Sequence, residues 1–211
     1  MKNIWRQDFP QIREGEAYLD TAAMSLKPQT VIDSVNHYYH DLSVNIHRGM
    51  YRTGLLTSDL YETARQKTAA FINAAPEEII FTRGTTSALN LVALAYGGAN
   101  LGPGDEIITS ELEHHSSFLP WQQLAAKTGA ILRFVPLDPS GRITIHNFRS
   151  VLTDKTKVVA LTYVSNVMGY ETPLKEIIAA AHEQGAVIVA DAAQAVQHIK
   201  IDVRDLDVDF L

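Results

Sequence analysis

The sequence contains no cysteine among its 211 residues. That absence excludes a disulfide framework, a thiolate nucleophile and a cysteine-based metal site within these residues. A net charge of −6 and the lack of any lysine or arginine cluster argue against nucleic acid or an anionic membrane surface as the main partner. A small molecule or another protein is therefore the expected partner.

Long apolar runs are absent as well. No stretch approaches the roughly 20 residues needed to span a bilayer, and the N-terminus lacks the apolar core of a signal peptide. We therefore expect a cytoplasmic protein with no membrane partner. Hydrophobic residues nevertheless make up 46% of the chain, which is enough for a substantial core.

From about Glu77 onward, short β-branched runs alternate with helical patterns. This alternation is typical of βαβ units, so we expect an α/β fold with a mainly parallel sheet. Strands are predicted at Glu78–Thr82, Glu106–Thr109, Ile131–Pro136, Lys157–Tyr163 and Ala186–Ala190, with a further one at Val208–Leu211. Helices are predicted at Ser87–Ala95, Ser117–Lys127, Ile145–Leu152 and Pro173–Glu183.

The first 75 residues lack this alternation. A short extended piece at Ala17–Asp20 precedes two predicted helices, Pro28–Leu42 and Leu55–Asn73, and the second helix has an amphipathic pattern. Between the helices, Val44–Gly54 is predicted to be a loop that contains charged residues, aromatic residues and two glycines. Loops of that length in compact domains are often functional.

The run from Val187 to Gln194 is the most informative stretch of the chain. An apolar strand pattern ends in Asp191, as in buried parallel strands that deliver an acid to the sheet edge where open α/β proteins bind ligands. Asp191 could pair with a protonated heterocyclic nitrogen or could cap the following turn. Gln194 could add a hydrogen bond to the same ligand or could face solvent.

Thr85 and Thr86 follow Gly84 where the first predicted strand gives way to a helix. Free backbone N–H groups and hydroxyls at such a place can hold a phosphate. The simpler alternative is that one of the threonines caps the helix.

Two further polar positions follow predicted strands. His114 could stack on a flat ligand or move protons, or it could be a solvated side chain before a helix. We expect no metal site, because adjacent histidines point in different directions and no third ligand is near His114 and His115 in the sequence. Asn166 could donate to a ligand oxygen or could form a turn.

The carboxyl ends of parallel strands meet at one edge of a sheet. Four strand-to-loop junctions should therefore place Thr85 with Thr86, His114, Asn166 and Asp191 around a single ligand.

Together these residues resemble those of pyridoxal-phosphate (PLP) enzymes of the aminotransferase class V group. The resemblance is closest to cysteine desulfurases and selenocysteine lyases of the SufS/CsdA type, and it runs from about Tyr18 to Leu211. The motifs that carry it are Tyr18–Ala23, Lys27–Pro28, His47–Gly49, Phe81–Thr86 with Asn90, Gly102–Ile107, Glu113–His115 with Pro120–Trp121, Val164–Asn166 and Asp191–Val196.

The resemblance implies a truncated PLP fold type I large domain over residues 21–211, with residues 1–20 belonging to an incomplete small domain. It also implies a role for each matching position. Thr85 and Thr86 would hold the cofactor phosphate, and a catalytic His114 would stack on the ring. Asp191 would pair with the ring nitrogen, and Asn166 and Gln194 would contact the ring hydroxyl. Ala22 and Ala23 would border the amino-acid pocket, and His47 and Arg48 would lie near the substrate end, in family homodimers serving the neighbouring subunit's site.

The implied activity is that of a cysteine desulfurase, which converts L-cysteine to L-alanine and passes the sulfur, as a persulfide, to an acceptor protein for iron–sulfur cluster assembly. In the family a Ser-Gly-His-Lys run with the Schiff-base lysine, and later a reactive cysteine, follow the segment at which this sequence ends. These 211 residues alone are therefore expected to bind PLP weakly or not at all and to be inactive. A kynureninase-like or epimerase-like enzyme, or a non-catalytic module that binds a cofactor or a partner, are the alternatives.

Overall fold

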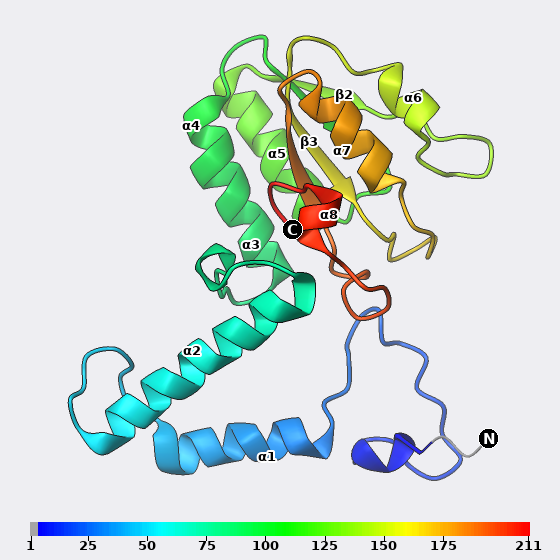
Figure 1. The fold of residues 1–211 in the computed structure, drawn as a ribbon. Coiled ribbons are helices and arrows are strands. Elements are labelled where there is room, and N and C mark those ends of the chain that lie inside the picture. The colour runs from blue at the N-terminus through cyan, green and yellow to red at the C-terminus, as the bar shows by residue number, and fades with distance from the viewer. Residues whose placement is uncertain (1–3) are drawn as a thin grey trace. The chain divides into compact units, whose positions relative to one another are not determined.

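The computed structural model describes residues 4–211 (Figure 1). The chain divides into two compact units, one up to Lys67 and the other from Thr68 to Leu211. The predicted assignment of residues 1–20 to a small domain stays a prediction.

The sheet lies in the second unit and has four strands in the order β2-β1-β3-β4. These strands are β1 (Glu106–Thr109), β2 (Ile131–Phe134), β3 (Thr156–Thr162) and β4 (Val187–Asp191). All their pairings are parallel. The predicted α/β class with a parallel sheet is confirmed, and these strands agree with their predicted bounds to within two residues.

Helices cover both faces of this sheet (Figure 1). The helices of the unit are α3 (Thr85–Val92), α4 (Gly98–Asn100), α5 (His115–Thr128), α6 (Ile145–Arg149), α7 (Leu174–His182) and α8 (Val203–Leu206), with a π-helical segment, Ala93–Gly97, between α3 and α4. Pro173 immediately precedes α7, and Gly185, with φ of +73°, follows it. A positive φ is strained for other residues, so glycine suits this helix end.

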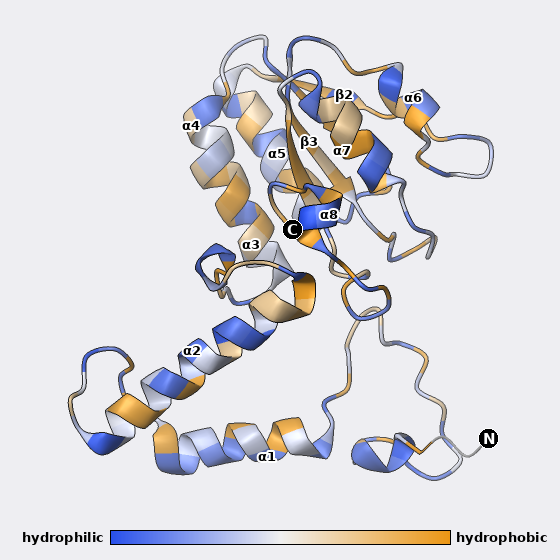
Figure 2. Cartoon of the chain, viewed as in Figure 1, coloured by the Kyte–Doolittle hydropathy of each residue, from blue (hydrophilic) through white to orange (hydrophobic). Residues whose placement is uncertain are grey.

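Two apolar cores follow from the alternation of side chains along each strand. Ile107, Val158 and Val189 pack with Trp121 and Leu124 of α5. Their neighbours along the same strands, among them Ile108, Val159 and Ile188, belong to a second core with the helices α6 and α7. Because both faces are covered here, the middle of β3, Val158–Leu161, is a continuous buried apolar run (Figure 2).

The first predicted strand is wrong. Pro76–Glu78 form a 3₁₀ turn and residues 79–82 belong to no strand, so the side chains of Ile80 and Phe81 remain 72% and 42% exposed. A strand exists only where a neighbour completes its hydrogen bonds, and no described strand pairs with this segment.

The last predicted strand is present only as a single parallel bridge between Phe210 and Val189. The amide of Phe210 donates to Ile188 O at 3.0 Å, and the amide of Ala190 donates to Phe210 O at 2.8 Å. Residues around Phe210 therefore form a single parallel bridge along the free edge of β4 rather than a full strand.

The first unit contains a 3₁₀ turn (Arg6–Asp8), α1 (Gln29–His37), a π-helical segment (Tyr38–Leu42) and the start of α2 (Arg52–Ile72). The predicted loop therefore ends earlier than expected, because Gly54 lies inside α2. A Cβ at Gly54 would come within 3.1 Å of the Gly49 carbonyl oxygen and 3.2 Å of its Cα. The close approach of the two segments explains glycine at this position.

Candidate cofactor-binding site

Asp191 ends β4 at the carboxyl edge of the sheet, opposite Thr162 of β3. It is 5% exposed, and its Oδ1 accepts a hydrogen bond of 3.0 Å from the amide of Ala193. The carboxylate thus caps the turn after the strand, as one of the two alternatives predicts. This contact uses one oxygen of the carboxylate and fixes its direction at the sheet edge.

Helix α3 begins at Thr85, and Gly84 is its N-cap. The alternative in which either threonine caps the helix is therefore wrong. Gly84 has φ of +147° and ψ of 173°, a region essentially restricted to glycine. No side chain caps this end, so the first amides of the helix are oriented toward an incoming anion. Thr85 and Thr86 are both exposed at this point.

His114 is the N-cap of α5. Its Nδ1 accepts a hydrogen bond of 3.2 Å from the amide of Ser116 and lies 2.7 Å from the Ser116 hydroxyl oxygen. In this geometry a neutral ring carries its proton on Nε2. The cap fixes the imidazole where the helix starts and leaves Nε2 for other contacts.

The two amide residues lie in turns. Asn166 is exposed in the loop after β3, where the Ser165 hydroxyl oxygen accepts hydrogen bonds from the amides of Val167 and Met168 at 3.3 and 3.1 Å. Gln194 is half-buried after β4, and its Oε1 accepts a hydrogen bond of 3.4 Å from Gln197. Both positions follow the carboxyl ends of strands, as the sequence predicts.

A cavity of about 340 Å³ joins two of the predicted junctions. Thr82, Gly84 and Thr85 line it from the start of α3, and Ala190, Ala192 and Ala193 line it from both sides of Asp191. The other predicted cofactor-binding residues, Thr86, His114, Asn166, Asp191 and Gln194, do not line this cavity. Nevertheless, Asp191 lies close enough to Glu113, the neighbour of His114, to help raise its pKa.

The predicted substrate residues belong to the first unit. Ala22 and Ala23 lie in an exposed turn, where the amide of Ala23 donates to Asp20 O at 3.1 Å. His47 has φ of +63°, and its Nε2 lies 3.3 Å from Glu62 Oε1. Arg48 is exposed. Their roles toward a substrate stay predictions.

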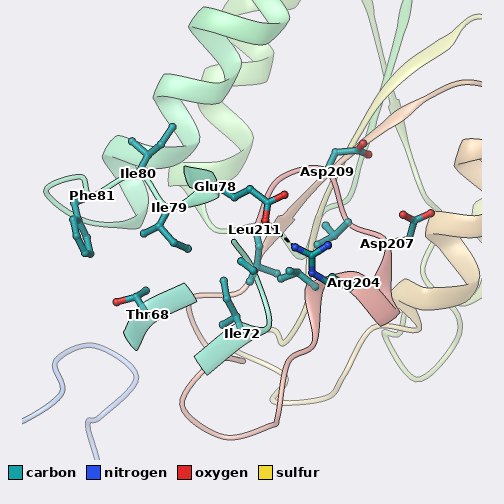
Figure 3. Close-up of a pocket in the computed structure, with 13 residues that line it drawn as sticks. Thr68, Ile72, Glu78, Ile79, Ile80, Phe81, Arg204, Asp207, Asp209 and Leu211 are labelled. Carbon is teal, nitrogen blue, oxygen red and sulfur yellow. Dashed lines mark ion pairs between the residues drawn. The ribbon is translucent and has the colours of Figure 1, made fainter. Parts of the chain in front are cut away.

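A larger cavity, of about 470 Å³, lies elsewhere in the second unit (Figure 3). It is lined by residues 79–81 and by the C-terminal segment, with Arg204 and Glu78 paired at 3.7 Å. None of the predicted site residues lines it. The smaller cavity at the carboxyl edge is therefore the better candidate.

The sequence alone did not single out Glu113 as a functional candidate, although it begins the motif Glu113–His115. Its Oε1 accepts a hydrogen bond of 2.7 Å from Ser110, and its Oε2 is buried without a partner. Burial, together with the charge of Asp191, raises the pKa of this carboxyl to about 7. A carboxylate in the short turn after β1, beside the predicted ring-stacking histidine, was the available signal.

These features fit PLP. The first amides of α3 suit a phosphate, and open space beside Gly84 leaves room for one. A buried carboxylate suits a protonated ring nitrogen, and the cavity is within the usual size range of ligand sites. Within residues 4–211, no group of three or more His, Asp or Glu side chains is placed to hold a metal ion, and no helix could span a membrane.

Comparison with known proteins defines the class. The Aminotransferase class-V family model matches residues 17–211, so the chain belongs to that family. The family implies PLP as the cofactor.

Within this family, similar curated relatives are named cysteine desulfurases. A probable cysteine desulfurase of Halalkalibacterium halodurans is 51% identical over 194 residues, covering 92% of this chain and 48% of the relative. A cysteine desulfurase of Synechococcus elongatus is 46% identical over 211 residues, covering 97% of this chain and 34% of the relative. The chain therefore spans about half or less of the length of these relatives.

Solved structures agree. A cysteine desulfurase of Thermococcus onnurineus superimposes with a TM-score of 0.91 at 38% identity, covering 97% of this chain and 50% of the other. The cysteine desulfurase CsdA of Escherichia coli gives a TM-score of 0.88 at 36% identity, covering 97% of this chain and 52% of the other. The predicted PLP fold type I architecture is thereby confirmed.

Proposed function

We propose that this chain forms the cofactor-holding part of a PLP-dependent cysteine desulfurase that acts on L-cysteine. The observation that carries the proposal is the carboxyl edge of the sheet. There the open N-terminus of α3 lines a cavity together with Ala190 and Ala192, the two neighbours of Asp191, and the carboxylate of Asp191 itself is buried at the same edge. The relatives named cysteine desulfurase support the choice of substrate.

The residues at this edge would act on the cofactor in distinct ways. Asp191 would hold the proton on the ring nitrogen, because a buried carboxylate stabilises an adjacent positive charge. Thr85, Thr86 and the first amides of α3 would bind the phosphate. When bound, PLP supplies an electron-withdrawing ring that stabilises negative charge on the substrate.

The remaining residues would orient the cofactor and the substrate. His114, held by its cap to Ser116, would stack on the ring and exchange protons through Nε2. Asn166 and Gln194 would contact the ring hydroxyl. Ala22 and Ala23 would border the amino-acid pocket, and in a homodimer His47 and Arg48 would lie near the substrate end of the neighbouring subunit's site. The full-length enzyme would be cytoplasmic. It would pass the sulfur to an acceptor protein for iron–sulfur cluster assembly.

Titration of the purified chain with PLP, followed by absorbance, tests the site. Asp191→Ala removes a charged partner, so we expect the dissociation constant to rise at least about tenfold. Thr86→Ala should raise it about threefold or more. Asp154→Ala is the matched control, because Asp154 is exposed just before β3, at the opposite edge of the sheet. Equal affinities for all variants would reject the proposed site.

An activity measurement tests the implied chemistry separately. Sulfide release from L-cysteine should stay at the level of a no-protein control when PLP is added to these 211 residues, because they contain no cysteine to accept the sulfur. Sulfide release that depends on both protein and PLP would contradict this expectation.

A further inference from the structure

A buried carboxyl group lies beside the candidate site in the turn between β1 and α5. Glu113 Oε1 accepts a hydrogen bond of 2.7 Å from the Ser110 hydroxyl, whereas Glu113 Oε2 is buried and has no hydrogen-bond partner among the described residues. Buried polar atoms without a partner are rare in folded proteins and call for an explanation. The oxygen belongs to the residue that directly precedes His114, the predicted ring-stacking residue, in the sequence.

A second buried group without a partner lies nearby. Ser117 is 1% exposed, and its hydroxyl makes no hydrogen bond of normal geometry with a described residue. It nevertheless lies near enough to the Glu113 carboxyl to lower its pKa, as does the backbone of Thr162 in β3. A small side-chain rotation that brings Glu113 Oε2 and Ser117 Oγ together would satisfy both orphaned atoms.

The surroundings of Glu113 disfavour its charged form. Asp191 acts on it from the end of β4 and Tyr170 lies near it in the loop after β3, and its own segment also carries Glu111, His114 and His115. Burial, followed by the repulsion from Asp191, raises the pKa of the Glu113 carboxyl to about 7, and it outweighs the opposing influence of Ser110, the Thr162 backbone and Ser117. The acid therefore keeps a proton up to neutral pH.

We propose that Glu113 is a positioning residue of the cofactor site, which as a neutral acid donates its proton to Ser117 Oγ and ties the loop carrying His114 to α5. The neutral form also spares Asp191 a second negative charge within the same buried region. This inference deepens the proposed function and rests on it, because its benefit is the placement of His114 and Asp191 for the cofactor.

The sign of the pH dependence follows from linkage. The folded-state pKa of Glu113 is about 7 and its ordinary value is 4.5, so the folded chain binds the proton more tightly than the unfolded chain. Stability should fall as the pH rises from about 4.5 to about 7 and change little from this group above that range. Glu113→Gln mimics the neutral acid and should remove this loss.

The first measurement is the melting temperature of the 211-residue chain at about pH 5 and pH 8.5. Glu113→Gln should match the unsubstituted chain at the lower pH and melt about 3–6 °C higher at the upper pH. Glu111→Gln is the matched control, because Glu111 is exposed two residues earlier, and it should follow the unsubstituted chain at both pH values. Parallel curves for Glu113→Gln and the unsubstituted chain would overturn the proposal.

The second measurement separates positioning from simple structural support. At pH 6, Glu113→Gln should bind PLP within about threefold of the unsubstituted chain, whereas Glu113→Ala should bind about tenfold more weakly. A variant Glu113→Ala that melts earlier but binds PLP normally would show a structural role only and reject the proposal. The affinity of Asp191→Ala for PLP tests the cofactor site itself. A failure of the proposed cofactor site can therefore be told apart from a failure of the proposed role of Glu113.

Discussion

Two glutamates, the buried Glu106 and the half-buried Glu113, lie toward opposite ends of β1 and ionise differently. Glu106 starts the strand, is 2% exposed, and accepts hydrogen bonds from Arg133 Nη2 and Thr153 Oγ1, both at 2.6 Å. Burial alone would raise its pKa, but these hydrogen bonds and the charge of Arg133 outweigh burial and hold the pKa below its ordinary value. Glu113 follows the other end of the strand, where burial prevails and raises the pKa to about 7.

The difference shows that pairing, rather than burial, decides which carboxyl is charged. At the amino edge of the sheet, Glu106 has a cation and a hydroxyl as partners, and these contacts stabilise the folded chain. At the carboxyl edge, none of the described groups that shift the pKa of Glu113 is a cation, and Asp191, whose carboxylate accepts a hydrogen bond from the amide of Ala193, acts on Glu113 with a like charge. The following predictions test this contrast.

The largest expected effect is at the amino edge. Arg133→Met leaves Glu106 buried without its cation and should lower the free energy of unfolding by about 2–4 kcal/mol. The lowered pKa of Glu106 means that its contribution is present above the ordinary value of 4.5 and is lost as the pH falls through the folded-state value. Urea unfolding at pH 7 and at about pH 3 should therefore show a smaller cost in acid.

Two further variants complete this test. Arg149→Met is the control, because Arg149 is exposed at the end of α6, and it should change stability by less than about 0.5 kcal/mol. Replacing Glu106 and Arg133 together by methionine should recover much of the loss. If the Arg133→Met variant were as stable as the unsubstituted chain, the ion pair at the amino edge would not contribute to stability.

An intermediate effect is expected at the carboxyl edge. Gly84→Ala places a side chain at φ of +147° and should cost about 1–3 kcal/mol of stability while weakening PLP binding. Gly98→Ala is the matched control, since Gly98 has a helical φ of −63° and alanine should stabilise by about 0.5–1 kcal/mol there. Urea unfolding and PLP titration of both variants measure this contrast. A Gly84→Ala variant with unchanged stability and unchanged PLP affinity would contradict the expectation that this position requires glycine.

The smallest effect concerns His182, whose pH dependence has the opposite sign to that of Glu106. Its Nε2 lies 3.0 Å from Asp209 Oδ2, and this hydrogen bond is the main reason that the His182 pKa is raised above 6.5. The stabilisation is present below pH 6.5 and is lost as the pH rises through the folded-state pKa.

His182→Ala should therefore cost about 1 kcal/mol at pH 5.5 and less at pH 9. Urea unfolding at the two pH values measures this, with His146→Ala, at an exposed position in α6, as the control. An equal cost at both pH values would mean that the imidazole acts by packing alone.

Much of the fold was predictable because the relevant signals are local. The strands β1 to β4 are apolar runs bounded by polar turns, and helices α5 and α7 start and end near the predicted residues. The pattern at residues 78–82 is equally strand-like, yet it forms no strand. Strand formation depends on a neighbour that the segment itself does not specify.

The candidate site divides in the same way. The sequence by itself determined which side chains lie at or after the strand ends, because the order of strands and loops along the chain places His114, Asn166 and Asp191 there. Only the tertiary structure decided that Gly84 caps α3, that Glu106 meets Arg133, and that Glu113 lies near Asp191. Backbone φ, burial and the distance between charges set these properties, and all three depend on segments far apart in the chain.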